Sequence, residues 1–270
     1  CKNNINISQR NNTMNFRIDN ANRGEIFTNI FQTVKTMTDH TPIMFKTDGL
    51  YMQVMDNAKV SIVELFLPSE WFNEYNCEID VTIGINSNIL YKILNTREKT
   101  QTIEVIYNDQ NNDTLSINFT SESKVAYDKS FLVPLVDIEI DQMTIPEIEY
   151  VAEFSVASNI FANLMNQLKQ FGETLDISCS EERITMSSNS YESGKMAVEI
   201  KIDDLETFAI DEGEQLNISF SLNYMQQICC CNKLSKDIEL KLCDQYPLSV
   251  IYDLEDQGSM KFYLAPKMDE

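Results

Sequence analysis

The chain has 270 residues and a formal net charge of −21 at pH 7, because 42 acidic residues stand against 21 basic ones. Taken whole, this charge argues against an ordinary nucleic-acid-binding protein, whose usual sign is a basic surface. No apolar run reaches 18 residues and no signal peptide is recognisable, so we expect an intracellular protein without a membrane span. The seven cysteines form no Cys-x-x-Cys pair, and we expect them to be reduced.

The first half of the chain predicts strands with two helices. Residues 1–13 are rich in Asn and aperiodic, so we expect a disordered extension. Apolar residues spaced as on one face of a helix predict a helix over 26–38 and a shorter one over 86–94. Alternating apolar and polar residues predict strands at 16–19, 50–54, 60–67, 103–107, 115–119 and 125–133, with a hairpin turn at Asp48-Gly49.

The stretch from Pro134 to Pro146 predicts a connector that lies across a surface. Its apolar residues alternate with acidic ones, which indicates an extended segment with one apolar and one charged face. Each proline lacks an amide donor and fixes its own φ, so neither favours a central strand or a helix interior. The alternating residues are Val136, Asp137, Ile138, Glu139, Ile140 and Asp141.

The order of elements then repeats. We expect a strand at 151–156, a helix that Ser158 caps and that runs to Phe171 before Gly172, strands to about residue 202, a helix over 222–230 and last strands ending at 263–264. Ile26-Phe-Thr-Asn-Ile30 matches Ile160-Phe-Ala-Asn-Leu164 at an offset of 134 residues, and the offset persists along the chain before it becomes 135.

The repetition predicts a duplicated α+β domain. Each copy consists of antiparallel strands with two helices, and the helices, which need only one apolar face, lie on one side of a sheet. The expected boundaries are an extension at 1–13, a first domain at 14–133, the connector at 134–146 and a second domain at 147–270.

Acidic residues are missing from the four helical windows 26–38, 86–97, 158–171 and 221–236. Helices tolerate Glu well, so helix propensity does not explain this. Two explanations stay open: the helices are largely buried, or their amide-rich face lies close to a polyanion. The basic residues in these windows are Lys35, Lys92, Arg97, Lys169, Lys233 and Lys236.

Three motifs follow one another in order. They are Asp48-Gly-Leu-Tyr-Met-Gln-Val-Met-Asp56 with Val60-Ser61 and Tyr75-Asn-Cys77, then Ile145-Pro-Glu-Ile-Glu-Tyr150, then Lys261-Phe-Tyr-Leu-Ala-Pro-Lys267. Together with the duplication, they resemble the DNA sliding clamps of the proliferating cell nuclear antigen family over about residues 14–270. The resemblance implies a closed, pseudo-sixfold trimeric ring that encircles duplex DNA and tethers DNA polymerase and other replication and repair proteins. It implies no catalysis, no cofactor and no metal, an ATP-driven clamp loader, and a place in the nucleus or a viral replication compartment.

The resemblance also implies roles for individual residues. Those expected to face DNA are Lys35, Lys92, Lys169, Lys233 and Lys236. Those expected at the subunit contact, where strand 125–133 pairs with strand 196–202 of the next chain, are Val125, Phe131, Val133, Met196, Val198 and Ile200. Those expected in a groove for peptides of the form Gln-x-x-aliphatic-x-x-aromatic-aromatic are Met55, Val60, Ile62, Met143, Ile145, Pro247, Tyr263, Ala265 and Pro266. Basic residues of the family are replaced by Asn163, Asn166 and Asn223, which predicts a less positive channel.

Other interpretations are an enzyme and a different kind of clamp. An enzyme is disfavoured, because His40 is the only histidine and the seven glycines form no phosphate-binding loop. Acidic pairs such as Glu139 and Asp141 are better explained as solvated surface than as a metal site. A subunit of a heterotrimeric checkpoint-type clamp and a monomeric viral processivity factor stay open as alternatives to a homotrimer.

Overall fold

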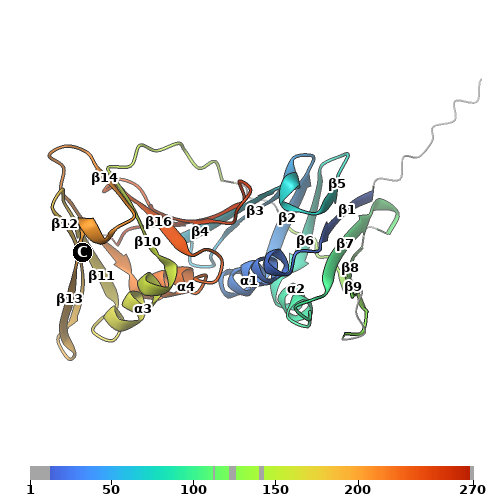
Figure 1. The fold of residues 1–270 in the computed structure, drawn as a ribbon, viewed down its shortest axis with the longest axis horizontal. Helices are drawn as coiled ribbons and strands as arrows, with labels where there is room; N and C mark the ends of the chain where they lie inside the picture. The colour runs from blue at the N-terminus through green and yellow to red at the C-terminus, as the bar shows by residue number, and fades with distance from the viewer. Residues whose placement is uncertain (1–12, 112, 122–125, 140–142, 268–270) are drawn as a thin grey trace, which may run out of the picture.

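The computed structural model describes residues 13–111, 113–121, 126–139 and 143–267 (Figure 1). The helices gather on one side of an elongated molecule, and the strands form its other sides. Apart from Thr13, which begins the first strand, the predicted extension over 1–13 lies outside the described residues.

The first half contains helices α1 (Ala21–Met37) and α2 (Ser87–Leu94), which pack against each other. Its strands are β1 (Thr13–Ile18), β2 (His40–Lys46), β3 (Gly49–Met55), β4 (Ser61–Pro68), β5 (Glu74–Asn76), β6 (Val81–Asn86), β7 (Thr102–Asn108), β8 (Thr114–Thr120) and β9 (Lys129–Pro134).

Helix α1 begins five residues before the predicted start at Ile26. Asn20 caps it, because its Oδ1 accepts hydrogen bonds from the backbone N–H groups of Asn22 (2.9 Å) and Arg23 (3.1 Å). The apolar stripe, which includes Ile30 and Phe31, is buried, as its helical spacing predicted. The first turn carries few apolar residues, so hydrophobic periodicity alone could not detect it.

The second half repeats this order with helices α3 (Ser158–Leu168) and α4 (Leu222–Cys229), which also pack together. Its strands are β10 (Ala152–Ala157), β11 (Thr174–Cys179), β12 (Arg183–Ser190), β13 (Gly194–Lys201), β14 (Thr207–Ile210), β15 (Leu216–Ser221), β16 (Asp237–Leu242), β17 (Leu248–Asp253) and β18 (Ser259–Leu264).

The predicted ends of α3 are wrong at both termini. Ser158 is the first helical residue rather than the cap, and its buried hydroxyl has no hydrogen-bond partner. The helix ends at Leu168, with Lys169 as its C-cap, before it reaches Gly172. A Cβ at Gly172 would lie 2.4 Å from the carbonyl oxygen of Asn189, so the glycine permits a close approach to β12 and does not end the helix.

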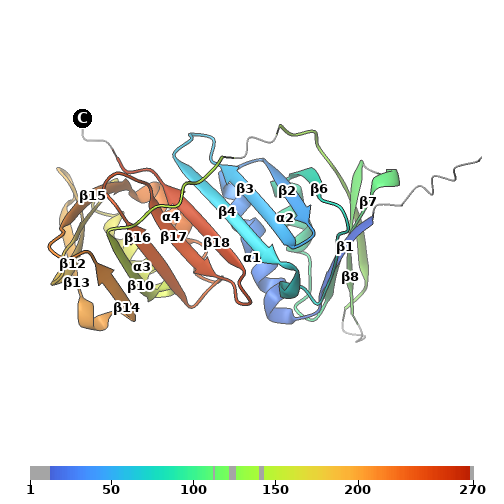
Figure 2. The same cartoon turned by 90° about the horizontal axis from the view of Figure 1, so that it is seen from above.

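Three antiparallel sheets contain all described strands. The order in the largest is β14-β10-β16-β17-β18-β4-β3-β2-β6, and the pairing of β18 with β4 joins the two halves of the chain. The other two sheets have the orders β5-β1-β7-β8-β9 and β13-β12-β11-β15. The helices cover the inner face of the nine-stranded sheet, and its outer face is crossed by the connector (Figure 2).

The connector has the two faces that its sequence predicted, as far as it is described. Val136 and Ile138 are half-buried, whereas Asp137 and Glu139 are exposed. Its first residues lie against β6, where the N–H of Val136 donates to the carbonyl of Gly84 (3.0 Å). A Cβ at Gly84 would lie 2.3 Å from the carbonyl oxygen of Val136, so the connector can lie this close only over a glycine. Ile140 and Asp141 lie outside the described residues.

A polar clasp also holds the two halves together. The indole N–H of Trp71, after β4, donates to the carbonyl of Leu254, after β17 (2.9 Å). The Arg23 guanidinium donates to the carbonyl of Trp71 (2.6 Å), lies over the indole ring and pairs with Asp256. Trp71 is fully buried, so the clasp adds a directional contact to the strand pairing of β4 and β18.

We expect Trp71→Phe to lower the free energy of unfolding by about 1–3 kcal/mol, because the buried carbonyl of Leu254 loses its donor. Urea unfolding followed by circular dichroism measures the change. Tyr127→Phe, at an exposed side chain, is the control and should stay within about 0.5 kcal/mol of the parent. Equal midpoints for parent and Trp71→Phe would show that the clasp contributes nothing to stability.

Candidate DNA-facing helices, peptide groove and subunit edges

The exposed side of the four helices is rich in amides. Six of the amide side chains that the sequence placed on a wet face are exposed, and Asn29 and Gln226 are half-buried. Burial therefore does not explain the absence of acidic residues from this exposed face. Within the described chain, the one acidic residue inside the four helices is Glu25, which precedes the acid-free window of α1. The six exposed amides are Gln32, Asn163, Asn166, Gln167, Gln170 and Gln227.

The five lysines expected to face DNA fall into two groups. Lys169 pairs with Glu173, and Lys236 lies 3.6 Å from Glu206 and 3.5 Å from Asp237. Attraction to these two carboxylates raises the pKa of Lys236. The charge of both lysines is therefore largely balanced at short range.

The remaining three, Lys35, Lys92 and Lys233, have no carboxylate within 4 Å in the part of the chain that the structure describes. The ammonium of Lys35 lies 3.9 Å from the ring centroid of Tyr91, a cation–π contact between α1 and α2. Lys92 and Lys233 are exposed.

The two strands expected at the subunit contact are edge strands at opposite ends of the molecule (Figure 1). Residues 126–128 are not part of a strand, so β9 begins at Lys129, later than predicted, and Val125 lies outside the described residues. Phe131 is half-buried against Phe119 (5.6 Å between centroids), and Val133 is fully buried.

On the other edge, Met196, Val198 and Ile200 are half-buried on one face of β13. Beside them lies a hollow of about 580 Å³, whose apolar lining includes Val198, Ile200, Leu164 and Ile160, the last 67% exposed. An apolar hollow at an unpaired strand edge is typical of a protein contact.

The residues expected in the peptide groove come together on the outer face of the nine-stranded sheet. Met55 is paired with Ile62 and Ile62 with Tyr263 across β3, β4 and β18. The N–H of Ala265 donates to the carbonyl of Val60 (3.0 Å). Pro247 directly precedes β17, the strand that pairs with β18. Pro266 directly follows Ala265. From the connector, Met143 and Ile145 line a hollow of about 720 Å³ together with Tyr263.

Gln53 fixes the connector, a role that the sequence did not predict. Its side chain accepts from the N–H of Met143 (2.8 Å) and donates to the carbonyl of the same residue (3.0 Å). Gln53 is only 8% exposed. A buried glutamine on a strand is a weak signal of a fixed backbone partner, but the partner lies 90 residues away in sequence and could not be identified without the fold.

Asp56 organises the loop at one end of the groove. Burial raises the pKa of its carboxyl, but hydrogen bonds from the backbone of Ser61, Ala58 and Val60 and from the hydroxyl of Tyr224 outweigh burial and hold the pKa below its ordinary value of 3.8. Tyr224 lies on α4, so this carboxylate also connects the loop to the second half of the chain.

We expect Asp56→Asn to lower the free energy of unfolding by about 1–3 kcal/mol at pH 7, because several of these bonds are made to a charge. Since the folded pKa lies below the unfolded one, the stabilisation is fully present above pH 3.8 and is lost as the pH falls further. Urea titrations at several pH values should therefore show the two proteins converging at low pH. An exposed connector residue supplies the control, Asp137→Asn; a constant difference between parent and Asp56→Asn at every pH would contradict the assignment.

Across the described ranges, no group of three His, Cys, Asp or Glu side chains is placed to hold a metal ion. The same part of the chain contains no helix with the length and apolar character that a membrane span requires. The six described cysteines are free thiols.

Comparison with protein families covers both halves of the chain. The model of the proliferating cell nuclear antigen N-terminal domain matches residues 15–144, and that of the C-terminal domain matches residues 144–267. Proteins of this family are non-catalytic DNA sliding clamps that act as processivity factors in DNA replication. The motifs, the duplication and the α+β fold agree with both matches. The chain therefore belongs to the proliferating cell nuclear antigen family of DNA sliding clamps.

Proposed function

We propose that three copies of this chain close into a ring around duplex DNA, with the helices as its inner wall, and tether DNA polymerase and other partners to the template. One observation carries the proposal: the sheet order β14-β10-β16-β17-β18-β4-β3-β2-β6 corresponds, strand for strand, to β5-β1-β7-β8-β9 followed by β13-β12-β11-β15. If β9 pairs with β13 of the next copy, it rebuilds the junction that β18 and β4 already form within each chain.

The exposure of the edge residues supports this pairing. At the internal junction, Phe262 and Val63 are cross-strand partners and both are fully buried. Their counterparts by sheet position, Phe131 on β9 and Met196 on β13, are half-buried at uncovered edges. Pairing would bring Phe131 opposite Met196, next to the apolar hollow that Val198 and Ile200 line, and would satisfy the unpaired backbone groups of both edges. Val125 and Val133 belong to the same proposed contact.

The ring holds DNA by enclosure, so a few weak phosphate contacts suffice and sliding stays easy. The lysines proposed to face the duplex are Lys35, Lys92, Lys169, Lys233 and Lys236. Three chains together carry a formal charge of −63. DNA is therefore not drawn in from outside, and we infer an ATP-driven loader that opens the ring. The corresponding place of action is the nucleus or a viral replication compartment.

Partner proteins are proposed to dock in the groove beneath the connector. A peptide of the form Gln-x-x-aliphatic-x-x-aromatic-aromatic would place a helical turn on the apolar surface of Met55, Ile62 and Tyr263. The flexible side chains of Met55 and Met143 suit a groove that accepts several ligands. The proposed domain limits, 14–133 and 147–270 with the connector between them, place this groove where both domains meet.

The ring proposal predicts a mass in solution of three times the 31.1 kDa chain, about 93 kDa. Light scattering after size exclusion measures it. We expect Phe131→Ala to shift the protein towards single chains, because it removes a central apolar contact, and Ile79→Ala, at an exposed isoleucine away from both edges, to leave the mass unchanged. The parent should also stay on closed circular DNA after loading and be released when the circle is cut. A parent mass of one chain would instead favour a mixed ring or a monomeric processivity factor.

The groove proposal predicts that Tyr263→Ala weakens binding of a synthetic peptide of this form at least about tenfold, measured by calorimetry, because a central aromatic contact is lost. Phe66→Ala is the matched control, since Phe66 lies on the same face of the same sheet, four residue pairs away from Ile62 along β4. Equal affinities for the parent and Tyr263→Ala would place the peptide elsewhere.

A further inference from the structure

A polar hollow of about 430 Å³ lies on the helical side of the first domain. It is bounded by the exposed side of α1, by the end of α2 with the loop after it, and by the segment that follows α4. Its lining offers amides and ammonium groups, and Glu25 is the one carboxylate of that lining. The residues that matter below are Asn29, Gln32, Asn95, Arg97, Lys99 and Lys233.

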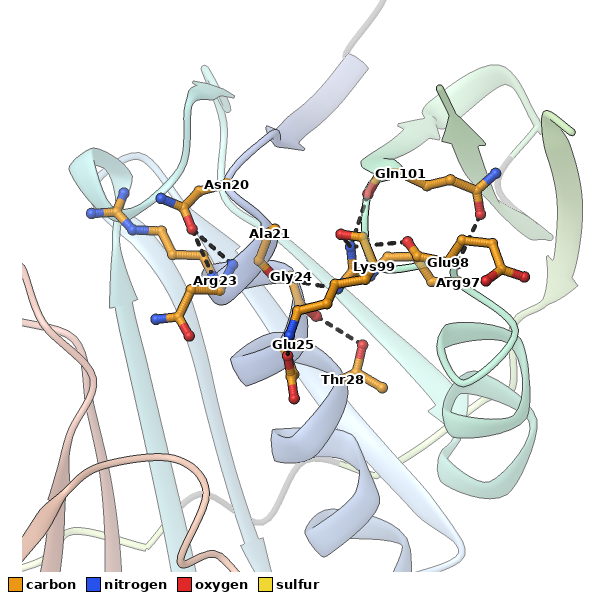
Figure 3. A network of polar contacts seen from close by, with 11 residues as sticks. Asn20, Ala21, Arg23, Gly24, Glu25, Thr28, Arg97, Glu98, Lys99 and Gln101 are labelled. Atoms are coloured by element: carbon orange, nitrogen blue, oxygen red, sulfur yellow. Dashed lines mark hydrogen bonds and ion pairs between the residues drawn. The ribbon is translucent and has the colours of Figure 1, made fainter. Parts of the chain in front are cut away.

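Arg97 places a fixed positive charge at this hollow. Its guanidinium donates to the carbonyls of Gln101 (2.9 Å), Lys99 (3.1 Å) and Ala21 (3.4 Å), as Figure 3 shows. A Cβ at Gly24 would lie 2.8 Å from Arg97 Cζ, so the guanidinium packs directly on α1 at this glycine, and a larger residue there would make it shift. Both terminal nitrogens of Arg97, Nη1 and Nη2, already donate to these backbone carbonyls, so we expect Arg97 to act mainly through its charge, while its neighbours supply donors.

Lys99 and Lys233 are the exposed donors at this hollow. Lys99 is 75% exposed and lies 3.3 Å from Glu25, a surface pair of small net strength (Figure 3). Lys233 reaches the hollow from the second domain and has no carboxylate within 4 Å among the described residues. Three cations thus surround the hollow against one carboxylate. At the helices of the second domain, by contrast, Lys169 and Lys236 are matched by three carboxylates.

We propose that this hollow seats a phosphate group of the DNA backbone, and that the duplex bears on this first-domain seat rather than on α3 and α4. The proposal rests on the proposed function, in which DNA passes the helical face. A phosphodiester is bound by groups that donate hydrogen bonds or carry positive charge, and this hollow offers ammonium groups, side-chain amides and a fixed guanidinium. Such contacts do not read the base sequence. A ring of three copies would have three such seats.

Neither Arg97 nor Lys99 was expected to face DNA. Arg97 is the last residue of the acid-free window 86–97, and Lys99 lies two residues further on, after Glu98. They lie at the helical face, where Arg97 packs the loop after α2 on Gly24 of α1, a contact between residues 73 positions apart.

The test compares two matched double variants in binding to a short linear duplex, measured by fluorescence anisotropy between about 50 and 200 mM salt. Lys99→Ala with Lys233→Ala should lower the affinity at the lowest salt by about tenfold and reduce the salt slope by about one for each lost phosphate contact. Arg17→Ala with Lys241→Ala removes the same formal charge and should change affinity by less than about twofold, because these two residues lie on strands β1 and β16, pair with carboxylates and belong to no helix of the proposed inner wall. Equal losses in both variants, or no loss in the first, would overturn the seat.

A gain-of-affinity variant separates binding from a structural role. Glu25→Gln frees Lys99 and should raise duplex affinity and the salt slope, which loss of a merely stabilising ion pair would not do. Glu239→Gln is the control, because Glu239 pairs with Lys241 at a similar distance (3.4 Å) on the outer face of the sheet. An equal gain in both variants would show a general charge effect and overturn the seat.

Two further arms identify the source of the phosphate and isolate the ring proposal. The first arm measures whether inorganic phosphate raises the thermal unfolding temperature of the parent and whether Lys99→Ala with Lys233→Ala abolishes this protection. If it does, and if neither double variant changes duplex affinity, the hollow is a site for free phosphate and the DNA seat is overturned. Failure of the parent to stay on closed circular DNA would overturn the ring itself. If all variants stay on the circle and their salt slopes on the linear duplex equal that of the parent, the phosphate seat is overturned and the ring proposal stands.

Discussion

The antiparallel pairing of β18 with β4 is the contact on which the rest of the molecule depends. It joins two sheets of one topology into nine strands, buries Phe262 against Val63, and brings both helix pairs to one side. The same pairing makes Ile62 and Tyr263 neighbours, and thereby places groove residues from both domains on one outer surface. It also leaves β9 and β13, the two strands that correspond to the joined pair, each with one unpaired edge at opposite ends of the molecule. Fold, groove and potential for ring closure therefore follow from one strand register.

The exposed side of the helices and the rest of the protein surface differ in charge. The acid-rich chain keeps carboxylates off the exposed side of its helices except at Glu25, and presents amides there. Amides can hydrogen-bond to water or phosphate without adding a charge that would hold the duplex in one place. The few cations of the helices differ in their surroundings: Lys169 is balanced by Glu173, whereas Lys35 lies against an aromatic ring. A sliding clamp needs this weak, smooth surface more than it needs affinity.

The connector is a covalent link whose position is set by a few polar contacts. Gly84 admits its start at the surface of β6, and Gln53 fixes its far part at Met143 by two backbone hydrogen bonds. Asp56, Tyr224 and the Trp71 clasp add contacts between the domains on which the groove lies. Because such bonds are directional, they set the height of the connector above the sheet, which apolar packing alone would specify less sharply.

The sequence by itself indicated most of the strands, the four helices, the duplication and the two faces of the connector, because the periods of two and of 3.6 residues are local properties of the chain. The motifs that resemble the family also indicated which residues to propose for the groove. What only the tertiary structure decided are contacts between distant residues: Gln53 with Met143, Trp71 with Leu254, and Arg97 on Gly24. The tertiary structure also distinguished the lysines that have a nearby carboxylate from those that have none among the described residues. It showed Ser158 as a buried helical residue rather than a cap. Pairing partners depend on how the sheets close, and a local pattern carries no information about which distant residue a side chain will meet.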